Sequence, residues 1–151
     1  MLQDLITTLD RQGINLNNVN FVGFSHFYSH AWKSRDPRVT FILDHSENFH
    51  HYFAEKELDF VISHQGLAHL FIPQQRHHMN QKIHALLKPE GIFLQDYFLW
   101  SLRMRDYKGN LLEWSDWLYK DFKVLRKEEI DAHRGLLIVR PKANLLKEVR
   151  P

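Results

Sequence analysis

The most informative stretch of the sequence is residues 58–98, LDFVISHQGLAHLFIPQQRHHMNQKIHALLKPEGIFLQDYF. Its first six residues, LDFVIS, are mostly β-branched or aromatic, which predicts a strand over residues 58–63. Pro73 then opens a helix, because proline is favoured in a first helical turn. The apolar residues of this helix recur at helical spacing on one face: Met79, Ile83, Leu86 and Leu87. Residues 88–91, KPEG, end the helix, and residues 92–94 begin a second strand.

Strands and helices also alternate along the rest of the chain. Further strands are expected over residues 19–24, 38–43, 122–125 and 136–139, further helices over 2–9, 27–32, 46–53 and 114–118, and an irregular segment over 99–113. This order predicts a single α/β domain over residues 1–151, with a mostly parallel sheet and helices on both faces.

Ligands of such sheets bind outside the carboxyl ends of the strands. The sequence therefore directs attention to four strand ends: residues 23–26, 44–46, 63–67 and 95–97.

The composition is that of a globular protein. Of the 151 residues, 44% are hydrophobic and 25% are charged, and a domain of this length buries enough surface to be stable without cross-links. Cysteine is absent, which excludes disulfides, thiolate metal sites and cysteine nucleophiles and favours a cytoplasmic location.

Charge and hydropathy limit the classes of binding partner that we expect. The chain has 20 Lys and Arg against 18 Asp and Glu, and a formal net charge of +2 gives no strong sign of nucleic-acid binding. No apolar run approaches the roughly 20 residues of a membrane-spanning helix, and residues 1–4, MLQD, lack the basic start of a secretory signal. We therefore expect no membrane association.

Residues 58–98 resemble the central region of class I S-adenosylmethionine-dependent methyltransferases. Those proteins carry a strand and loop of the form FD-x-V-x-S…L-x-H, which five residues match here: Asp59, Val61, Ser63, Leu67 and His69. Their next helix ends in LKPGG, which residues 87–91, LKPEG, match with Glu90 in place of the first glycine. Residues 122–142, FKVLRKEEIDAHRGLLIVRPK, are similar to the final antiparallel strand pair of that family. Together with the N-terminal strands, the resemblance spans about residues 15–142.

The resemblance implies a Rossmann-like domain of the methyltransferase type with S-adenosylmethionine as its cofactor. The acceptor of the methyl group is not identified by it. The resemblance places the cofactor across three strand ends, formed by Gly23, Phe24 and Ser25, by Asp44, His45 and Ser46, and by Ser63, His64 and Gln65.

The first strand end departs from the family pattern, which has an acidic residue followed by a G-x-G-x-G turn. Phe21 stands where the acid would be, and Gly23 is the one glycine that remains. Ser25 takes the second glycine position and Phe27 the third. A phenylalanine at a position of close backbone approach occupies space that the cofactor would use.

The second departure is a short segment after the second strand. Only 13 residues, 45–57, separate Asp44 from Leu58, where the family fits a helix, a third strand and its loop. We therefore expect a fold that is shortened around the third strand. Asp44 itself lies 21 residues after Gly23, close to the ~20-residue spacing of an acid that binds a ribose hydroxyl.

Each candidate residue also has a structural interpretation. Asp44 binds a ribose or forms a turn after its strand, and Gly23 admits a ligand or permits a turn. His64 is the candidate catalytic base, since the unperturbed pKa of histidine is near 6.5, or it is a solvated residue that follows a strand. His69 matches a family position at which packing is the expected role.

The 11 histidines do not form a metal motif. His50-His51 and His77-His78 are adjacent pairs, and side chains of helical neighbours do not face each other. Because thiolates are also absent, we expect no metal site.

Two functions remain open. The first is a compact S-adenosylmethionine-dependent methyltransferase acting on an unidentified acceptor. The second is a degenerate member without cofactor, which acts as a binding or scaffolding subunit of a larger assembly. Aromatic residues such as Trp100, Trp114 and Trp117 would then be contacts, and the shortened sheet edge would allow pairing with a second copy.

Overall fold

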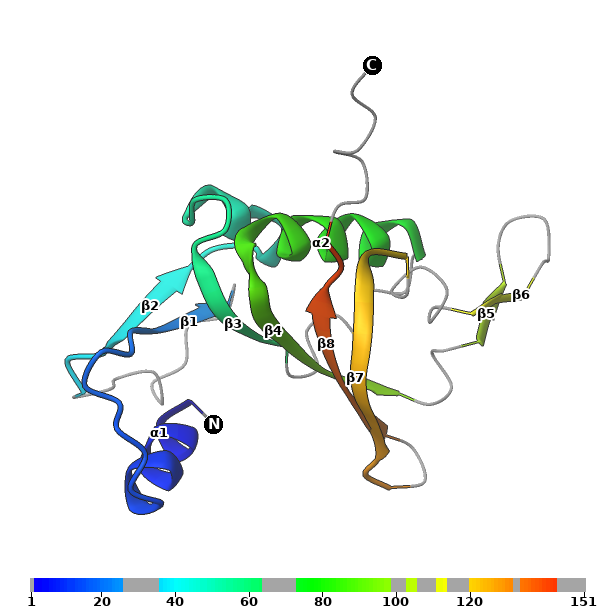
Figure 1. The fold of residues 1–151 in the computed structure, drawn as a ribbon. Helices are drawn as coiled ribbons and strands as arrows, with labels where there is room; N and C mark the ends of the chain where they lie inside the picture. The colour runs from blue at the N-terminus through cyan, green and yellow to red at the C-terminus, as the bar shows by residue number, and fades with distance from the viewer. Residues whose placement is uncertain are drawn as a thin grey trace. The chain divides into compact units, whose positions relative to one another are not determined.

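The computed structural model of the chain describes residues 2–25, 36–63, 73–98, 103–105, 111–113, 120–131 and 134–143. The chain forms two compact units, Met1–Phe49 and His50–Pro151. Figure 1 labels the helices and strands of both units. The expected single domain over residues 1–151 stays a prediction.

The first unit combines one helix with a pair of parallel strands. Helix α1 (Leu2–Arg11) confirms the predicted N-terminal helix, and Ile6 on its apolar face is fully buried. Strand β1 (Phe21–Ser25) pairs in parallel with β2 (Val39–Leu43) over their whole length. The parallel pairing means that both strands end at the same edge of the unit.

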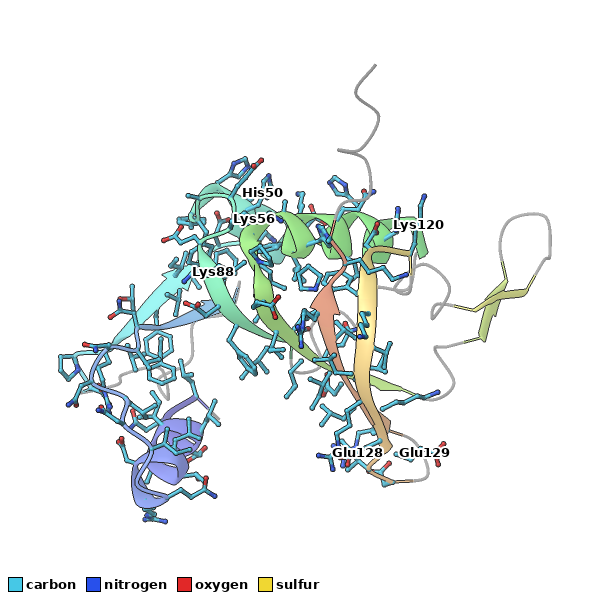
Figure 2. All side chains as sticks on the ribbon, in the orientation of Figure 1. His50, Lys56, Lys88, Lys120, Glu128 and Glu129 are labelled. Atoms are coloured by element: carbon cyan, nitrogen blue, oxygen red, sulfur yellow. The ribbon has the colours of Figure 1, made fainter. Side chains whose placement is uncertain are left out.

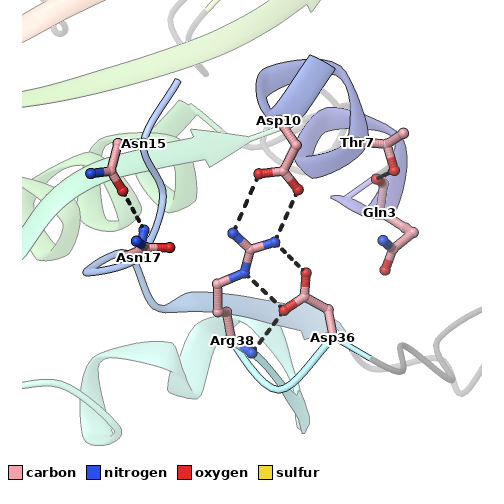
Figure 3. A network of polar contacts seen from close by, with 7 residues as sticks. All are labelled: Gln3, Thr7, Asp10, Asn15, Asn17, Asp36 and Arg38. Carbon is pink, nitrogen blue, oxygen red and sulfur yellow. Dashed lines mark hydrogen bonds and ion pairs between the residues drawn. The ribbon is translucent and has the colours of Figure 1, made fainter. Parts of the chain in front are cut away.

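An arginine joins α1 to the amino end of β2. The guanidinium of Arg38 donates through Nε and Nη2 to the two carboxylate oxygens of Asp36, at 2.9 and 2.6 Å, and Nη2 also lies 3.1 Å from Oδ2 of Asp10 on α1 (Figure 3). The hydrogen bonds from Arg38 lower the pKa of Asp36 to about 2, and the two carboxylates raise the pKa of Arg38. This network lies at the opposite end of β2 from Leu43, so its role is structural.

We predict that Asp36→Asn destabilises the first unit in a pH-dependent way. The pKa of Asp36 falls from 3.8 to about 2 on folding, so its stabilising effect is complete above about pH 4 and is lost as the pH falls towards 2. The difference between wild type and variant in urea unfolding should therefore be larger at about pH 7 than at about pH 3.

The control for this prediction is Asp59→Asn, which removes the partner of Lys88 from an exposed ion pair of the second unit. Exposed pairs contribute little, so this variant should lose less stability than Asp36→Asn at about pH 7. A loss in Asp36→Asn that is the same at both pH values would contradict the role given to its ionised carboxylate.

The second unit contains a four-stranded mixed sheet with the order β3-β4-β8-β7. Its elements are β3 (Leu58–Ser63), α2 (Pro73–Leu86), β4 (Leu87–Phe98), β7 (Phe122–Glu129) and β8 (Arg134–Pro141). Strands β3 and β4 are parallel, whereas β8 is antiparallel to both of its neighbours. Figure 1 shows α2 running across the strands of this sheet.

Helix α2 buries one apolar face against the sheet. Met79, Ile83 and Leu86 of the helix are at most 5% exposed. The sheet strands contribute five further buried apolar side chains: Leu87, Phe93, Phe122, Leu137 and Val139. The ring of Phe122 joins the two layers, because its centroid lies 5.3 Å from that of His84 on α2 and 5.8 Å from that of Phe93 on β4.

The LKPEG segment turns the chain directly from α2 into β4. The register between β3 and β4 shifts within it, since Leu58 lies opposite Leu87 whereas Phe60 lies opposite Ile92. A Cβ atom built on Gly91 would lie only 3.1 Å from the carbonyl oxygen of Leu58 and 3.0 Å from that of Lys88. The Cβ atom would also lie 2.9 Å from Cδ2 of Leu87, so the neighbouring atoms would have to shift, whereas glycine fits without that shift.

The connection from β2 to β3 is short and is fixed to the end of α2. Residues 44–57 contain a 3-10 helix, η2 (Ser46–His51), and no strand. Lys56 has a φ of 57°, and its backbone N–H donates to the carbonyl oxygen of Ala85 at 3.0 Å. Its ammonium donates to the carbonyl oxygen of His84 at 3.2 Å, so that Lys56 caps the carboxyl end of α2 (Figure 2).

The outer strand β7 carries mostly charged residues. Lys123, Arg126, Lys127, Glu128 and Glu129 all belong to it, and the two glutamates lie near its end (Figure 2). Arg126 forms an ion pair with Glu128 on the same strand. The register with β8 shifts between Val124 and Arg126, which marks a bulge in this edge strand.

Several sequence predictions need correction. Residues 99–113 are not all irregular, because β5 (Arg103–Arg105) pairs with β6 (Leu111–Glu113). The expected helix over residues 46–53 is the shorter η2, and β4, β7 and β8 are longer than expected. The helices expected over residues 27–32 and 114–118 lie outside the described residues. None of the described helices is both long and apolar enough to cross a membrane.

We predict that Gly91→Ala destabilises the second unit by about 1–3 kcal/mol, the usual cost of overpacking. The reason is that two of the three atoms nearest to the new Cβ belong to the backbone and cannot rotate away. Urea unfolding of both proteins measures this difference.

The matched control is Glu90→Ala in the same segment. Glu90 is paired with Arg140, but the two side chains are 82% and 37% exposed, so its loss should cost only about 0–1 kcal/mol. Equal losses for the two variants would show that the space at Gly91 does not limit the packing of β3 and β4.

Candidate functional site

The carboxyl ends of β1 and β2 bring six of the predicted cofactor residues into one region of the first unit. Gly23, Phe24 and Ser25 lie on β1, and the Asp44-His45-Ser46 segment follows β2 directly. The backbone N–H of Asp44 donates to the carbonyl oxygen of Ser25 at 3.0 Å, which extends the pairing of the strands by one residue. The two predicted strand ends are therefore neighbours.

The carboxylate of Asp44 accepts two hydrogen bonds from residues that follow it in the chain. Its Oδ1 atom accepts hydrogen bonds from the backbone N–H of His45 at 2.6 Å and from Nδ2 of Asn48 at 3.0 Å. The turn-forming role that the sequence offered as one alternative is thus present. Asn48 was not predicted as part of this region, although an amide four residues after the aspartate was a usable signal.

Gly23 lies in the middle of β1, and a phenylalanine occupies the space beside it. Its partner across the strand pair is Phe41. A Cβ atom on Gly23 would lie 2.5 and 2.6 Å from Cδ1 and Cε1 of Phe41, and 3.5 Å from Cδ2 of Leu2 on α1. The absence of a side chain at Gly23 therefore makes room for the Phe41 ring, a contact that the sequence analysis also missed.

The opposite face of β1 is covered by η2. Phe24 and Phe49 pack edge to face, with ring centroids 6.5 Å apart and planes at 78°. The side chain of Phe24 is half-buried there, whereas His45 is exposed. Of the six predicted residues of this unit, Phe24 thus has a packing role.

The third predicted strand end belongs to the second unit. Ser63 is the last residue of β3 and lies opposite Gln95 of β4. The candidate base His64, the cofactor residue Gln65 and His69 lie outside the described residues, so their predicted roles stay predictions.

The histidines that the structure describes do not gather into a metal site. The rings of His50 and His51 have centroids 3.9 Å apart. In the described stretches no group of three or more His, Asp or Glu side chains is arranged to hold a metal ion.

The residues at the ends of β1 and β2 fit the implied cofactor in part. Asp44 has the position that a ribose-binding acid needs, at the carboxyl end of the second parallel strand. Gly23 does not form the open cradle of a glycine-rich turn, because Phe41 fills the space that its missing Cβ leaves.

Two parallel strand pairs, a helix that connects β3 to β4 and polar residues at the strand ends are features of an α/β protein of Rossmann-like type. No protein-family model matches the sequence. No curated protein sequence matches it either.

Solved structures identify the fold more closely. A Burkholderia thailandensis 1,6-didemethyltoxoflavin-N1-methyltransferase with bound S-adenosylhomocysteine is similar over 89% of this chain and 66% of its own, with a TM-score of 0.66 and 16% identity. A SAM-dependent methyltransferase from Methanosarcina mazei is similar over 80% of this chain and 81% of its own, with a TM-score of 0.57 and 16% identity. A chain in the complex between the Haloferax volcanii Trm112 methyltransferase activator and a methyltransferase is similar over 92% of this chain and 77% of its own, with a TM-score of 0.63 and 12% identity.

The chain has the α/β, Rossmann-like fold of the class I S-adenosylmethionine-dependent methyltransferases. Identities of 12–16% show the fold alone, and fold does not determine function.

We predict that Gly23→Ala destabilises the first unit by about 1–3 kcal/mol in the wild-type background. In the background of Phe41→Val, which removes the ring but keeps a β-branched strand residue, the same change should cost less, with a coupling of about 0.5–3 kcal/mol. Urea unfolding of the four proteins measures this coupling.

A cost of Gly23→Ala that is equal in the two backgrounds would show that Phe41 is not the reason for the glycine. The close approach of a ligand would then be the explanation for a glycine at residue 23.

Proposed function

We propose that this protein is a compact S-adenosylmethionine-dependent methyltransferase. The observation that carries the proposal is the position of Asp44, which the hydrogen bond to the Ser25 carbonyl holds at the carboxyl ends of two parallel strands. In a fold of this class that is the place of an acid that binds ribose hydroxyls.

In methyl transfer, the chain would bind S-adenosylmethionine and orient it towards the acceptor. When bound, S-adenosylmethionine supplies a methyl group on a positively charged sulfur. Asp44 would hold the ribose, and Ser25 would provide a polar group beside it. The roles predicted for Ser63 and Gln65 stay predictions, and His64 is the proposed base where the acceptor has a proton to lose. Methyl transfer needs mainly alignment of donor and acceptor, so a base is not obligatory.

The test is calorimetric titration of the purified chain with S-adenosylhomocysteine and S-adenosylmethionine. We expect micromolar binding that Asp44→Ala weakens by about 1.5–3 kcal/mol, or roughly ten- to hundredfold, the contribution of a hydrogen bond to a charged group. An absence of heat at about millimolar ligand, together with an unchanged melting temperature, would overturn the proposal.

Asn48→Ala is the matched control, because Asp44→Ala also removes the local hydrogen bonds of the carboxylate with His45 and Asn48. Asn48→Ala removes one of these hydrogen bonds and keeps the carboxylate. It should lower the stability of the first unit but leave the affinity for S-adenosylhomocysteine unchanged. Equal losses of affinity in both variants would show that Asp44 acts through η2 and not on the ligand.

The second candidate is a degenerate methyltransferase fold that binds a protein partner instead of the cofactor. It is favoured by the Phe41 ring beside Gly23 and by the loss of the other two glycines of the family pattern. A protein partner is compatible with the activator complex among the similar structures. Under this alternative the chain does not bind S-adenosylhomocysteine, and its native mass exceeds that of one chain. We place the protein in the cytoplasm under either function, because it has no cysteine.

A further inference from the structure

The two oxygens of the Asp44 carboxylate are not equivalent. Oδ1 already accepts two hydrogen bonds from the chain, from the backbone N–H of His45 at 2.6 Å and from Nδ2 of Asn48 at 3.0 Å. An ionised carboxylate has about two lone-pair sites on each of its oxygens. Both sites of Oδ1 are therefore filled, and a hydroxyl group that binds Asp44 has to donate to Oδ2.

The two donors to Oδ1 are held in place by the backbone around them. The N–H of His45 belongs to the main chain directly after Asp44, and the backbone N–H of Asn48 donates to the carbonyl oxygen of His45 at 2.8 Å. Phe49, the next residue, packs its ring edge to face against Phe24 of β1. A ligand hydroxyl that displaced the Asn48 amide would exchange one donor for another, so the exchange gains little.

The Asp44 carboxylate lies where a ligand can approach it. Asp44 is half-buried, and both of its neighbours in the chain, Leu43 and His45, are exposed. All these residues belong to the first unit, Met1–Phe49. A contact between Asp44 and a ligand thus needs no residue of the second unit.

A ribose carries two hydroxyls on neighbouring carbons. An acid can bind both when each hydroxyl donates to its own carboxylate oxygen, but with Oδ1 filled both would have to donate to Oδ2. Donors at the two lone pairs of one oxygen lie roughly 4–5 Å apart at the usual hydrogen-bond length, which is more than the separation of the two hydroxyls. Oδ2 can therefore accept only one ribose hydroxyl with good geometry.

We propose that Asp44 holds its nucleoside through a single ribose hydroxyl, so that the site accepts deoxyribonucleosides as well as ribonucleosides. This inference rests on the proposed methyltransferase function, because it specifies how the nucleoside part of the cofactor binds at Asp44. Loss of the hydroxyl that donates to Oδ2 removes a hydrogen bond to a charged group and weakens binding. Loss of the other hydroxyl leaves this contact intact.

The test compares nucleosides that differ only in their ribose hydroxyls: adenosine, 2′-deoxyadenosine, 3′-deoxyadenosine and 2′,3′-dideoxyadenosine. Each is titrated into the purified chain by calorimetry. One of the two monodeoxy nucleosides should bind about as tightly as adenosine. The other should bind roughly ten- to hundredfold more weakly, like the dideoxy compound.

Two variants show whether Asp44 causes this order of affinities. Asp44→Ala should weaken adenosine binding to the level of the dideoxy compound and abolish the differences among the nucleosides. Asp10→Ala is the matched control, because it removes a carboxylate of the same unit that pairs with Arg38 ahead of β2. It should keep the wild-type order. The series on the wild-type chain remains decisive where a variant is unstable, since it changes the ligand and not the protein.

Similar losses with both monodeoxy nucleosides would overturn the proposal, because both hydroxyls would then be bound. Equal binding of all the nucleosides would overturn it as well, and so would an order of affinities that survives in Asp44→Ala.

Titration with S-adenosylhomocysteine separates this inference from the proposed function. Binding of S-adenosylhomocysteine together with any of these contrary results, or with no binding of adenosine, refutes the single-hydroxyl contact alone. The expected order of nucleosides without binding of S-adenosylhomocysteine refutes the methyltransferase and keeps the contact. If neither S-adenosylhomocysteine nor adenosine binds, both are refuted.

Discussion

The second unit depends on one close approach, that of the Gly91 backbone to the carbonyl oxygen of Leu58. A Cβ atom at residue 91 would lie 3.1 Å from this oxygen, so a larger residue would force β3 and β4 to shift at the point where α2 ends. The pairing that follows from it sets Ser63 opposite Gln95 at the other end of the strands. The position of Gln95 opposite Ser63 thus depends on a backbone contact four residues earlier on β4.

The sequence predicted the elements whose apolar residues recur with a clear period. Helix α2 and strand β3 have the expected starts, because LDFVIS is a strand sequence and Pro73 opens a helix. Strand β7 is longer than expected because Arg126–Glu129 carry charges that an edge strand tolerates. Strands β5 and β6 were missed, since three residues are too few to show a period of two.

The candidate site was predictable as a set of strand ends but not in its contacts. The spacing from Gly23 identified Asp44, and the structure places Asp44 beside the end of β1. The hydrogen bond from Asn48 to the Asp44 carboxylate is local, and its spacing was available in the sequence. The position of the Phe41 ring beside Gly23 depends on strand register, which a single sequence does not reveal. A family pattern assigns such a glycine to the cofactor, whereas its nearest neighbour in space is a side chain of the same unit.

The charged edge of β7 has a consequence for how this protein behaves at high concentration. An outer strand offers unpaired backbone groups to any extended segment, but a new strand here would have to pack beside Lys123, Arg126 and Lys127. The bulge between Val124 and Arg126 further breaks the regular ladder that such a strand would need. This edge is thereby protected against the strand-by-strand growth that leads to aggregates.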